Sequence, residues 1–197
     1  MLLVLFIPGV VWSSEPDTAK ELMPDTSSME NAKCPEFLDY TSRLLHSSKE
    51  VNLCQVAGNK PVLIVNTASH CGFTKHFKPL EAIHQQYKDQ GLVVIGFPSD
   101  DFFQEDDEES KAADICFVNY GVTFTMLAPS SVRGDDANAV FKFLAKHATS
   151  PKWNFYKYIV SNGGAKVKAY SPLTSPTAPE FIEALEIELG ITSGNGN

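Results

Sequence analysis

Four cysteines carry the most reactive chemistry in this sequence, and they are Cys34, Cys54, Cys71 and Cys116. They form no C-x-x-C pair and have no zinc-type spacing with histidine, so a structural metal site is not expected. Cys71 closely follows an apolar, β-branched run, residues 61–69, that predicts a buried strand. A helix is expected next, and the N–H groups and dipole at a helix N-terminus favour the thiolate form of a cysteine. Cys71 is therefore a candidate nucleophile; the alternative is a small buried cysteine at a strand end.

Cys34 and Cys54 flank residues 36–53, ahead of the first strongly buried strand. In an oxidising compartment they could form a disulfide that fastens this segment to the domain. Such a bond closes a loop of about 20 residues and contributes roughly 3 kcal/mol in the chain-entropy description. In the cytosol they would be two ordinary thiols.

The elements around Cys71 predict a parallel βαβ unit. Thr74 is a plausible N-cap for a helix with apolar residues at helical spacing, and Gly91 ends that pattern. Residues 92–97 form a second buried strand, closed by Pro98. Strand, helix and strand with short links indicate a right-handed unit on a parallel sheet.

The rest of the chain predicts further helices and a hairpin. A helix over residues 110–121 carries Cys116, and a short strand follows at 122–127. The next helix is capped by Asp135 and Asp136 and runs to Ala145. Strands 155–160 and 165–170 are joined around Asn162-Gly163, and a capping box at 177–180 begins the last helix, whose apolar stripe is Phe181, Leu185, Ile187 and Leu189. This order predicts an α/β protein with a central mixed β-sheet flanked by helices, which is the thioredoxin-like arrangement.

Composition excludes several classes of function. The chain has 197 residues with 16 basic and 24 acidic side chains and a formal net charge of −8. Binding to a phosphate backbone needs a basic surface, so nucleic acid is not an expected partner. No segment reaches the roughly 20 apolar residues of a membrane span. We expect one soluble globular domain over residues 32–197.

The N-terminal 31 residues have a composition of their own. Leu2–Trp12 is an apolar run, and a polar stretch follows it. The apolar run has the length of a signal-peptide hydrophobic region and is too short for a membrane-spanning helix. A positive n-region and a clean cleavage site are absent. We expect residues 1–31 to be a leader-like, flexible segment and the protein to be exported, to the periplasm or outside the cell; the alternative is a disordered tail.

Four motifs resemble those of the glutathione peroxidases. Asn66–Thr74 (NTASHCGFT) is similar to the family's nucleophile motif N-V-A-S-x-C/U-G-x-T, and Gly96–Glu105 (GFPSDDFFQE) to G/A-F-P-C-N-Q-F-G-x-Q-E. Asn119–Phe124 (NYGVTF) and Lys152–Phe155 (KWNF) match in order and approximate spacing. The resemblance runs from near Val51 to the last helix.

The resemblance implies reduction of hydrogen peroxide and organic hydroperoxides without a cofactor or metal. The peroxidatic residue would be Cys71, with Gln104, Trp153 and Asn154 beside it. Neutral amide and indole donors suit this chemistry, because they stabilise charge on sulfur and on the leaving oxygen without supplying a competing acid. Cys116 looks like the resolving cysteine of the thioredoxin-dependent members and would condense with a Cys71 sulfenic acid. The alternative is that Cys116 is a buried, inert thiol with no resolving role.

The sequence departs from the family pattern in three places. The second motif is one residue shorter between Phe102 and Gln104, and Asp100-Asp101 stands where Asn-Gln is usual. Thr125 replaces the usual proline. Cysteine stands at position 71, where some members use selenocysteine, a stronger nucleophile at neutral pH.

The acidic run Asp100–Glu109 surrounds Gln104, so we expect it to border the active site and to repel anionic glutathione. A thioredoxin-like protein is the better candidate for the reductant; the alternative is that the run is a solvated loop with screened charge.

The short stretch between Phe124 and Trp153 lacks the insertion through which tetrameric members associate, so we expect a monomer. Two other functions on the same fold remain: a non-catalytic redox sensor, and a thiol-disulfide oxidoreductase, which would require a second cysteine where Thr74 stands.

Overall fold

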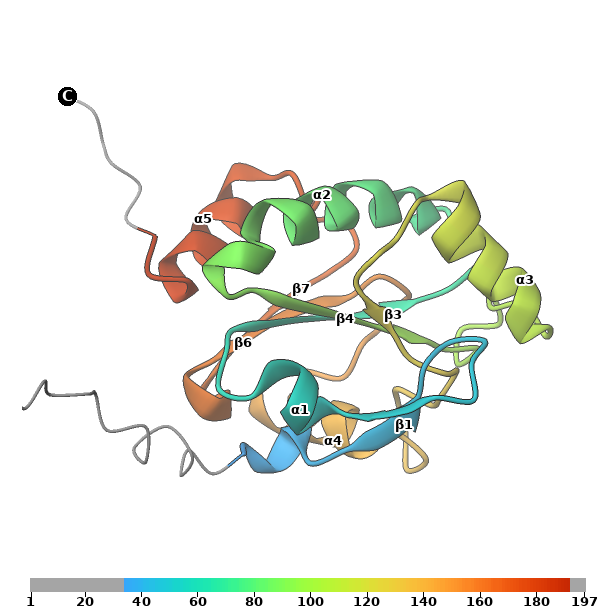
Figure 1. Ribbon diagram of the computed structural model, residues 1–197, viewed down its shortest axis with the longest axis horizontal. Helices are drawn as coiled ribbons and strands as arrows, with labels where there is room; N and C mark the ends of the chain where they lie inside the picture. Colours follow the sequence, from blue (N-terminus) through green and yellow to red (C-terminus); the bar gives the residue numbers. More distant parts are fainter. Residues whose placement is uncertain (1–33, 192–197) are drawn as a thin grey trace, which may run out of the picture. The chain divides into compact units, whose positions relative to one another are not determined.

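A mixed five-stranded β-sheet runs through the part of the chain that this computed structural model describes, residues 34–191 (Figure 1). The strand order is β5 (Thr125–Met126), β4 (Val93–Pro98), β3 (Val62–Thr67), β6 (Lys157–Ser161) and β7 (Lys166–Tyr170). The pairs β3–β4 and β4–β5 are parallel, whereas β3–β6 and β6–β7 are antiparallel. The predicted βαβ unit, hairpin and mixed sheet are therefore confirmed.

Helices cover both faces of the sheet. α2 (Phe77–Tyr87) and α5 (Pro179–Glu188) lie on one face, and α1 (Leu53–Ala57) and α4 (Ala139–His147) lie on the other (Figure 1). Alternate residues of β3 enter the two cores: Leu63 and Val65 pack on the α2 side, and Ile64 packs on the α4 side. Burial on both faces explains why the β3 sequence is continuously apolar instead of alternating.

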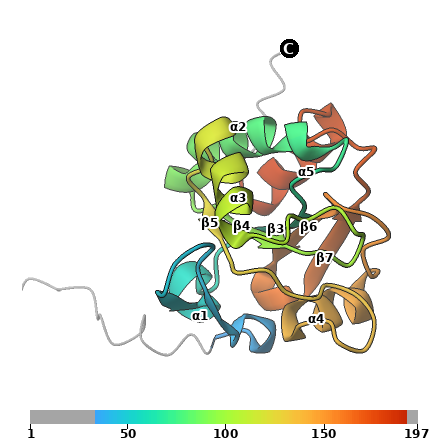
Figure 2. The ribbon, with the colours of Figure 1, turned by 90° about the vertical axis from the view of Figure 1, so that its right-hand side faces the viewer.

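The carboxyl ends of β3 and β4 lie at one edge of the sheet, together with the loops that follow them. Figure 2 views the molecule from this side, with α3 (Glu109–Ala113) and the loop after β4 in view. In an open α/β sheet this edge is the usual place for a functional site. The Cys71 loop follows β3, and the loop with Gln104 follows β4, so the parallel pairing brings these two segments together.

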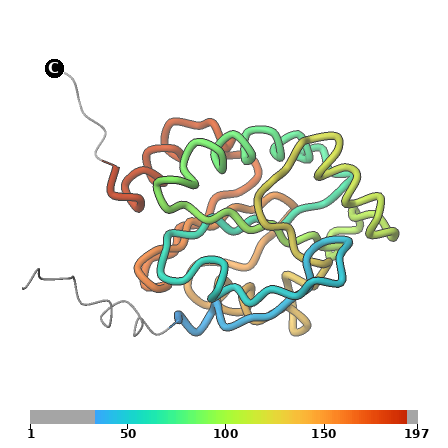
Figure 3. Tube along the Cα trace, in the orientation of Figure 1, coloured from blue at the N-terminus to red at the C-terminus, as the bar shows by residue number. Residues whose placement is uncertain are grey.

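An N-terminal segment that the sequence did not predict lies beside this sheet and is drawn in blue and cyan in Figure 3. It consists of a 3₁₀ turn at Glu36–Leu38 and a hairpin of β1 (Thr41–Arg43) and β2 (Glu50–Asn52). An isolated bridge between Leu44 and Leu127 joins the hairpin to the chain just after β5. The short edge strand β5 is thereby covered, which protects it from pairing with another chain.

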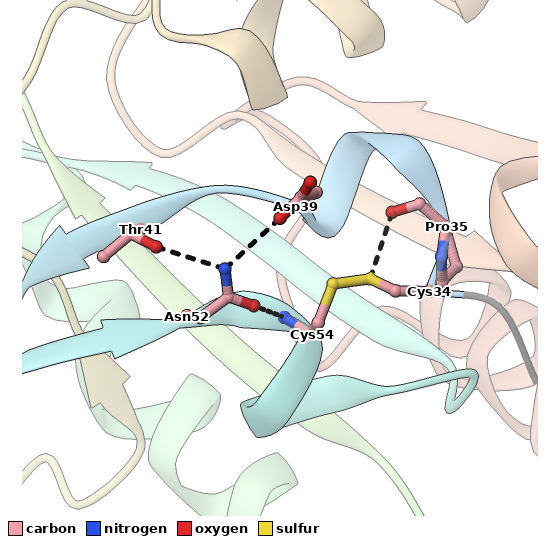
Figure 4. The surroundings of a disulfide bond; sticks show 6 residues. All are labelled: Cys34, Pro35, Asp39, Thr41, Asn52 and Cys54. Atoms are coloured by element: carbon pink, nitrogen blue, oxygen red, sulfur yellow. Dashed lines mark hydrogen bonds between the residues drawn. A yellow bond between two sulfur atoms is a disulfide. The ribbon is translucent and has the colours of Figure 1, made fainter. Parts of the chain in front are cut away.

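A disulfide joins Cys34 to Cys54, with a sequence separation of 20 (Figure 4). It fastens the start of the described chain to α1, and Asn52 caps α1 by accepting a hydrogen bond from the Cys54 N–H over 2.9 Å. The pairing expected for an oxidising environment is therefore present.

Several predicted boundaries and caps were wrong. α4 is capped by Asn138, whose Oδ1 accepts from the Phe141 N–H over 3.1 Å, and not by Asp135 or Asp136. Ala178 precedes α5 without any side-chain cap, so residues 177–180 form no capping box, although a proline does occupy the first turn. Ile187 is 57% exposed and does not belong to the apolar stripe of α5.

Other elements are shorter than predicted or change type. The strand expected at 122–127 reduces to the two residues of β5, and β6 begins at Lys157 rather than Phe155. The helix predicted over 110–121 divides into α3 and a π-helix, Asp114–Asn119. Within residues 34–191, no helix is long and apolar enough to cross a bilayer. The leader-like segment 1–31 lies outside the described residues.

Candidate active site

Cys71 lies in the loop between β3 and α2 and is 7% exposed. Its backbone N–H donates to the hydroxyl of Thr74 over 3.1 Å, and that hydroxyl lies 2.9 Å from the carbonyl oxygen of Ala68, to which it can donate in turn. Thr74 thus closes the Cys71 loop and opens a 3₁₀ turn (Thr74–His76) ahead of α2, instead of capping α2 as predicted. The N–H of Phe73 points at the Cys71 Sγ over 3.5 Å. A main-chain donor therefore faces the sulfur, as expected at a strand-to-helix junction.

The loop after β4 is hydrogen-bonded to the Cys71 loop. The His70 N–H donates to the Gln104 carbonyl over 2.9 Å, and the His70 ring lies 3.0 Å from the Asp106 carboxylate. The Glu105 carboxylate accepts hydrogen bonds from both the N–H and the hydroxyl of Ser69. The acidic run therefore borders the candidate nucleophile, as the sequence predicted.

Burial sets the protonation of Glu105. Desolvation raises the pKa of its carboxyl group, and the hydrogen bonds from Ser69 and from the Asp106 N–H oppose that rise only in part. Asp106 behaves in the opposite way, because hydrogen bonds from the Glu108 N–H and the His70 ring lower its pKa. The two neighbouring acids differ because desolvation is the largest influence on Glu105, whereas hydrogen bonds to the charged form outweigh desolvation at Asp106.

Gln104 and Asn154 meet side chain to side chain. Asn154 is fully buried, and its Nδ2 donates to Oε1 of Gln104 over 3.1 Å. Trp153 is 41% exposed and its ring lies 5.6 Å from that of Phe102. Gln104 is thus bonded to the Cys71 loop through its carbonyl and to Asn154 through its side chain, whereas the Trp153 ring lies beside Phe102. Within residues 34–191, none of the three side chains hydrogen-bonds to the Cys71 sulfur.

Asn66 holds the Trp153–Phe155 segment against the end of β3, a role that was not predicted from the sequence. Its Nδ2 donates to the Trp153 carbonyl over 3.1 Å, and its own carbonyl accepts from the Phe155 N–H over 2.7 Å. Asn66 opens the first motif, so its place there was the available signal. The side chain is completely buried, which fits a positioning role better than contact with substrate.

Cys116 lies in the π-helix and is 3% exposed. Burial raises the pKa of its thiol to about 12, and the nearby Glu105 carboxylate adds to the rise. Cys71 and Cys116 are both free thiols and belong to the same hydrophobic cluster. A π-helix is a rare, wide turn that commonly occurs at functional sites, so the Cys116 segment is suited to local opening.

The site has a small acidic cavity and no metal-binding cluster. A cavity of about 360 Å³ lies beside Gln104 and is lined by His70, Asp100, Phe103, Glu105, Asp106 and Asp107. In the described part of the chain, no group of three or more His, Cys, Asp or Glu side chains could hold a metal ion. The Cys71 sulfur faces the Phe73 N–H, and the Gln104 amide, which is bonded to that of Asn154, lies on the loop that is hydrogen-bonded to the Cys71 loop.

Known proteins share both the sequence and the fold of this chain. A glutathione peroxidase-like peroxiredoxin of Chlamydomonas reinhardtii is 45% identical over 64% of this chain and 83% of its own length. A glutathione peroxidase of Lactococcus lactis is 38% identical over 73% of this chain and 94% of its own. The crystal structure of Trgpx in its apo form superposes with a TM-score of 0.60 at 30% identity and covers 78% of this chain and 95% of that one.

The sequence model for glutathione peroxidase matches residues 37–145, a span that contains Cys71, Gln104 and Cys116. Trp153 and Asn154 lie beyond that match, and the hydrogen bond of Asn154 to Gln104 comes from the structure. The thioredoxin-like fold predicted from the order of elements is confirmed by the superposition. This chain belongs to the glutathione peroxidase family, a family of peroxidase enzymes.

Proposed function

We propose that this protein reduces hydrogen peroxide and organic hydroperoxides with Cys71 as the peroxidatic residue. The observation that carries the proposal is the hydrogen-bonded link from the Cys71 loop through Gln104 to Asn154. The Cys71 thiolate attacks one peroxide oxygen, the O–O bond breaks, and the other oxygen leaves as an alcohol or water after taking up a proton. The attacked oxygen stays on sulfur as a sulfenic acid.

Cys116 then resolves the sulfenic acid. Its thiol attacks the Cys71 sulfur, a disulfide forms, and the sulfenic hydroxyl leaves as water with the thiol proton. The two Cα atoms must come within about 7 Å for this bond. Opening of the π-helix would release the buried Cys116 for it. A dithiol reductant restores both thiols through a mixed disulfide.

A thioredoxin-like protein is the proposed reductant. Asp100, Asp106 and Asp107 line the cavity beside Gln104, and this charge disfavours the anionic glutathione tripeptide. The names of the relatives include both glutathione peroxidase and peroxiredoxin. Turnover measured in parallel with glutathione and with a thioredoxin-type protein, at equal concentrations, separates the two. Faster turnover with glutathione would reject this choice of reductant.

The test of the peroxidase chemistry is a thiol count. Reduced protein treated with one equivalent of peroxide should lose two thiols and gain a Cys71–Cys116 disulfide. Cys71→Ser should abolish the reaction, whereas Cys116→Ser should stop at the sulfenic acid and fail to recycle. Activity retained in Cys71→Ser would reject the proposal, and a single oxidation that stalls in the presence of excess reductant would indicate a redox sensor instead.

Export and a monomeric state complete the proposal. The Cys34–Cys54 disulfide supports an oxidising compartment, because such bonds rarely persist in the cytosol. Cell fractionation and analytical ultracentrifugation test the two statements. A reduced, cytosolic protein or a stable tetramer would contradict them.

A further inference from the structure

Lys157 is a fully buried lysine at the start of β6, where its backbone pairs with Val65 of β3 and Tyr170 of β7. Its Nζ donates to the carbonyl oxygens of Phe155 and Ser171, each over 3.0 Å. In the described part of the chain it forms no ion pair with a carboxylate. Burial accordingly lowers the pKa of its amino group to about 8.

A buried ammonium without a counter-charge is a poor way to stabilise a fold. Removing the charge from water is costly, and an apolar side chain of similar length would avoid that cost. The role of Lys157 must therefore lie in the particular groups that its ammonium contacts, and not in the stability of the fold. The relevant contact is the Phe155 carbonyl, because it follows directly after Trp153 and Asn154.

Phe155 has a left-handed backbone conformation with φ of 62°, which is unfavourable for a bulky residue. Three hydrogen bonds to main-chain groups of Trp153 and Phe155 hold the turn around it. Asn66 makes two of them, to the Trp153 carbonyl and from the Phe155 N–H, and Lys157 makes the third, to the Phe155 carbonyl. The residue between these anchors is Asn154, and within residues 34–191 its side chain hydrogen-bonds to Gln104 alone.

We propose that Lys157 is a positioning residue for peroxide reduction, whose buried ammonium fixes the left-handed turn at Phe155 and so keeps Asn154 against Gln104. The inference rests on the proposed function. Lys157 acts through the backbone and does not touch the peroxide. Charge-assisted hydrogen bonds to a carbonyl are stronger than neutral ones, which is why an ammonium serves here better than a hydroxyl or amide.

The test is Lys157→Met, which keeps the length of the side chain and removes its charge. We expect the second-order rate constant for oxidation of Cys71 by hydrogen peroxide to fall about 10- to 100-fold, as for a small misplacement of a catalytic group. The midpoint of urea unfolding should stay the same or rise, because a buried charge has been removed. Lys168→Met is the matched control: Lys168 lies on β7, is solvent-accessible and faces Glu188, and this variant should keep the wild-type rate.

A spectroscopic readout reports on the turn itself. The chain has two tryptophans, so a Trp12→Phe background leaves Trp153 as the sole emitter. In that background Lys157→Met should lower the fluorescence anisotropy of Trp153 and increase its quenching by acrylamide. Lys168→Met should change neither.

The outcomes separate this inference from the proposed function. Failure of the wild-type protein to react with peroxide would reject the proposed function. A wild-type rate in folded Lys157→Met, or a loss of stability without a loss of rate, would overturn only the role of Lys157. Lys157→Gln retains one pair of N–H donors and is used if the methionine variant does not fold. Loss of the folded state in both variants would show that Lys157 supports the fold itself, and this would also overturn the inference.

Discussion

The Nδ2 of Asn154 donates to Oε1 of Gln104 over 3.1 Å, and this bond joins the loop ahead of β6 to the loop after β4. Because the Gln104 oxygen is occupied, its Nε2 group is the part of the amide that remains to donate, and it has no hydrogen-bond partner within residues 34–191. Asn154 therefore determines which end of the Gln104 amide is offered to a reacting oxygen. Such pre-arranged neutral donors stabilise the charge that develops when an O–O bond breaks.

Asn154→Asp tests this relationship by replacing the donor with an acceptor. Two oxygens would then face each other at a buried position, so Gln104 has to turn away or the new carboxyl group has to stay protonated. We expect a fall of about 100-fold in the rate constant for Cys71 oxidation, measured by stopped-flow with hydrogen peroxide. Asn162→Asp is the control, because Asn162 is exposed in the β6–β7 turn. Equal rates in the two variants would contradict the role given to Asn154.

The main elements of the fold could be predicted because their sequences are unambiguous. β3 and β4 are covered on both faces and read as continuous apolar runs, and α2 shows apolar residues at helical spacing. The hairpin β1–β2 was missed because each of its strands has three residues and neither contains a buried side chain. The cap of α4 was misassigned because three polar residues that favour caps stand close together, and only Asn138 reaches the Phe141 N–H.

In the candidate site, too, some residues could be predicted from the sequence and others could not. Cys71, Gln104 and Asn154 could be predicted because they belong to recognisable motifs. The contacts of Asn66 and Lys157 with this site run through main-chain carbonyls, which every residue has, so no residue type reveals them. The π-helix was also hidden, because its one-residue expansion leaves the spacing of the apolar residues nearly unchanged.

Glu105 predicts a pH dependence of stability. Burial raises its pKa in the folded protein, so the folded state binds this proton more tightly than the unfolded state. Protonated Glu105 therefore contributes to the free energy of unfolding below the pKa of this group in the unfolded state, and that contribution is lost as the pH rises through its pKa in the folded state. The unfolding free energy of Glu105→Gln should therefore increase relative to that of the wild type as the pH is raised from 4 to 7. The measurement is urea unfolding at both pH values, and a difference that does not change with pH would contradict the assignment.

The Cys116 thiol should be unreactive until its helix opens. With a pKa of about 12, only ~10⁻⁴ of the thiol is ionised at pH 8, against roughly a tenth or more in an unfolded chain. In a Cys71→Ser background, we expect iodoacetamide to label Cys116 at least about 10³-fold more slowly in buffer than in urea, as followed by mass spectrometry. Equal labelling rates would show that the buried position is not maintained in solution.

The Cys34–Cys54 disulfide should stabilise the fold without affecting the chemistry. It closes a loop with a sequence separation of 20, and the loss of chain entropy in the unfolded state corresponds to about 3 kcal/mol. The double variant Cys34→Ala/Cys54→Ala should lose about this amount of unfolding free energy and retain the rate of Cys71 oxidation. A large drop in rate would instead indicate that the N-terminal segment influences the site.

Phe103 combines two unfavourable features in the loop that carries Gln104. It is 86% exposed and has a left-handed backbone with φ of 59°, in a loop one residue shorter than the pattern it resembles. Asparagine accepts this conformation more readily than phenylalanine, so Phe103→Asn should raise the unfolding free energy by about 1 kcal/mol. Leu173→Asn is the control, because Leu173 is 84% exposed and has no positive φ. If both variants shift the urea midpoint equally, the backbone at Phe103 stores no strain, and the shortened loop imposes no cost on the presentation of Gln104.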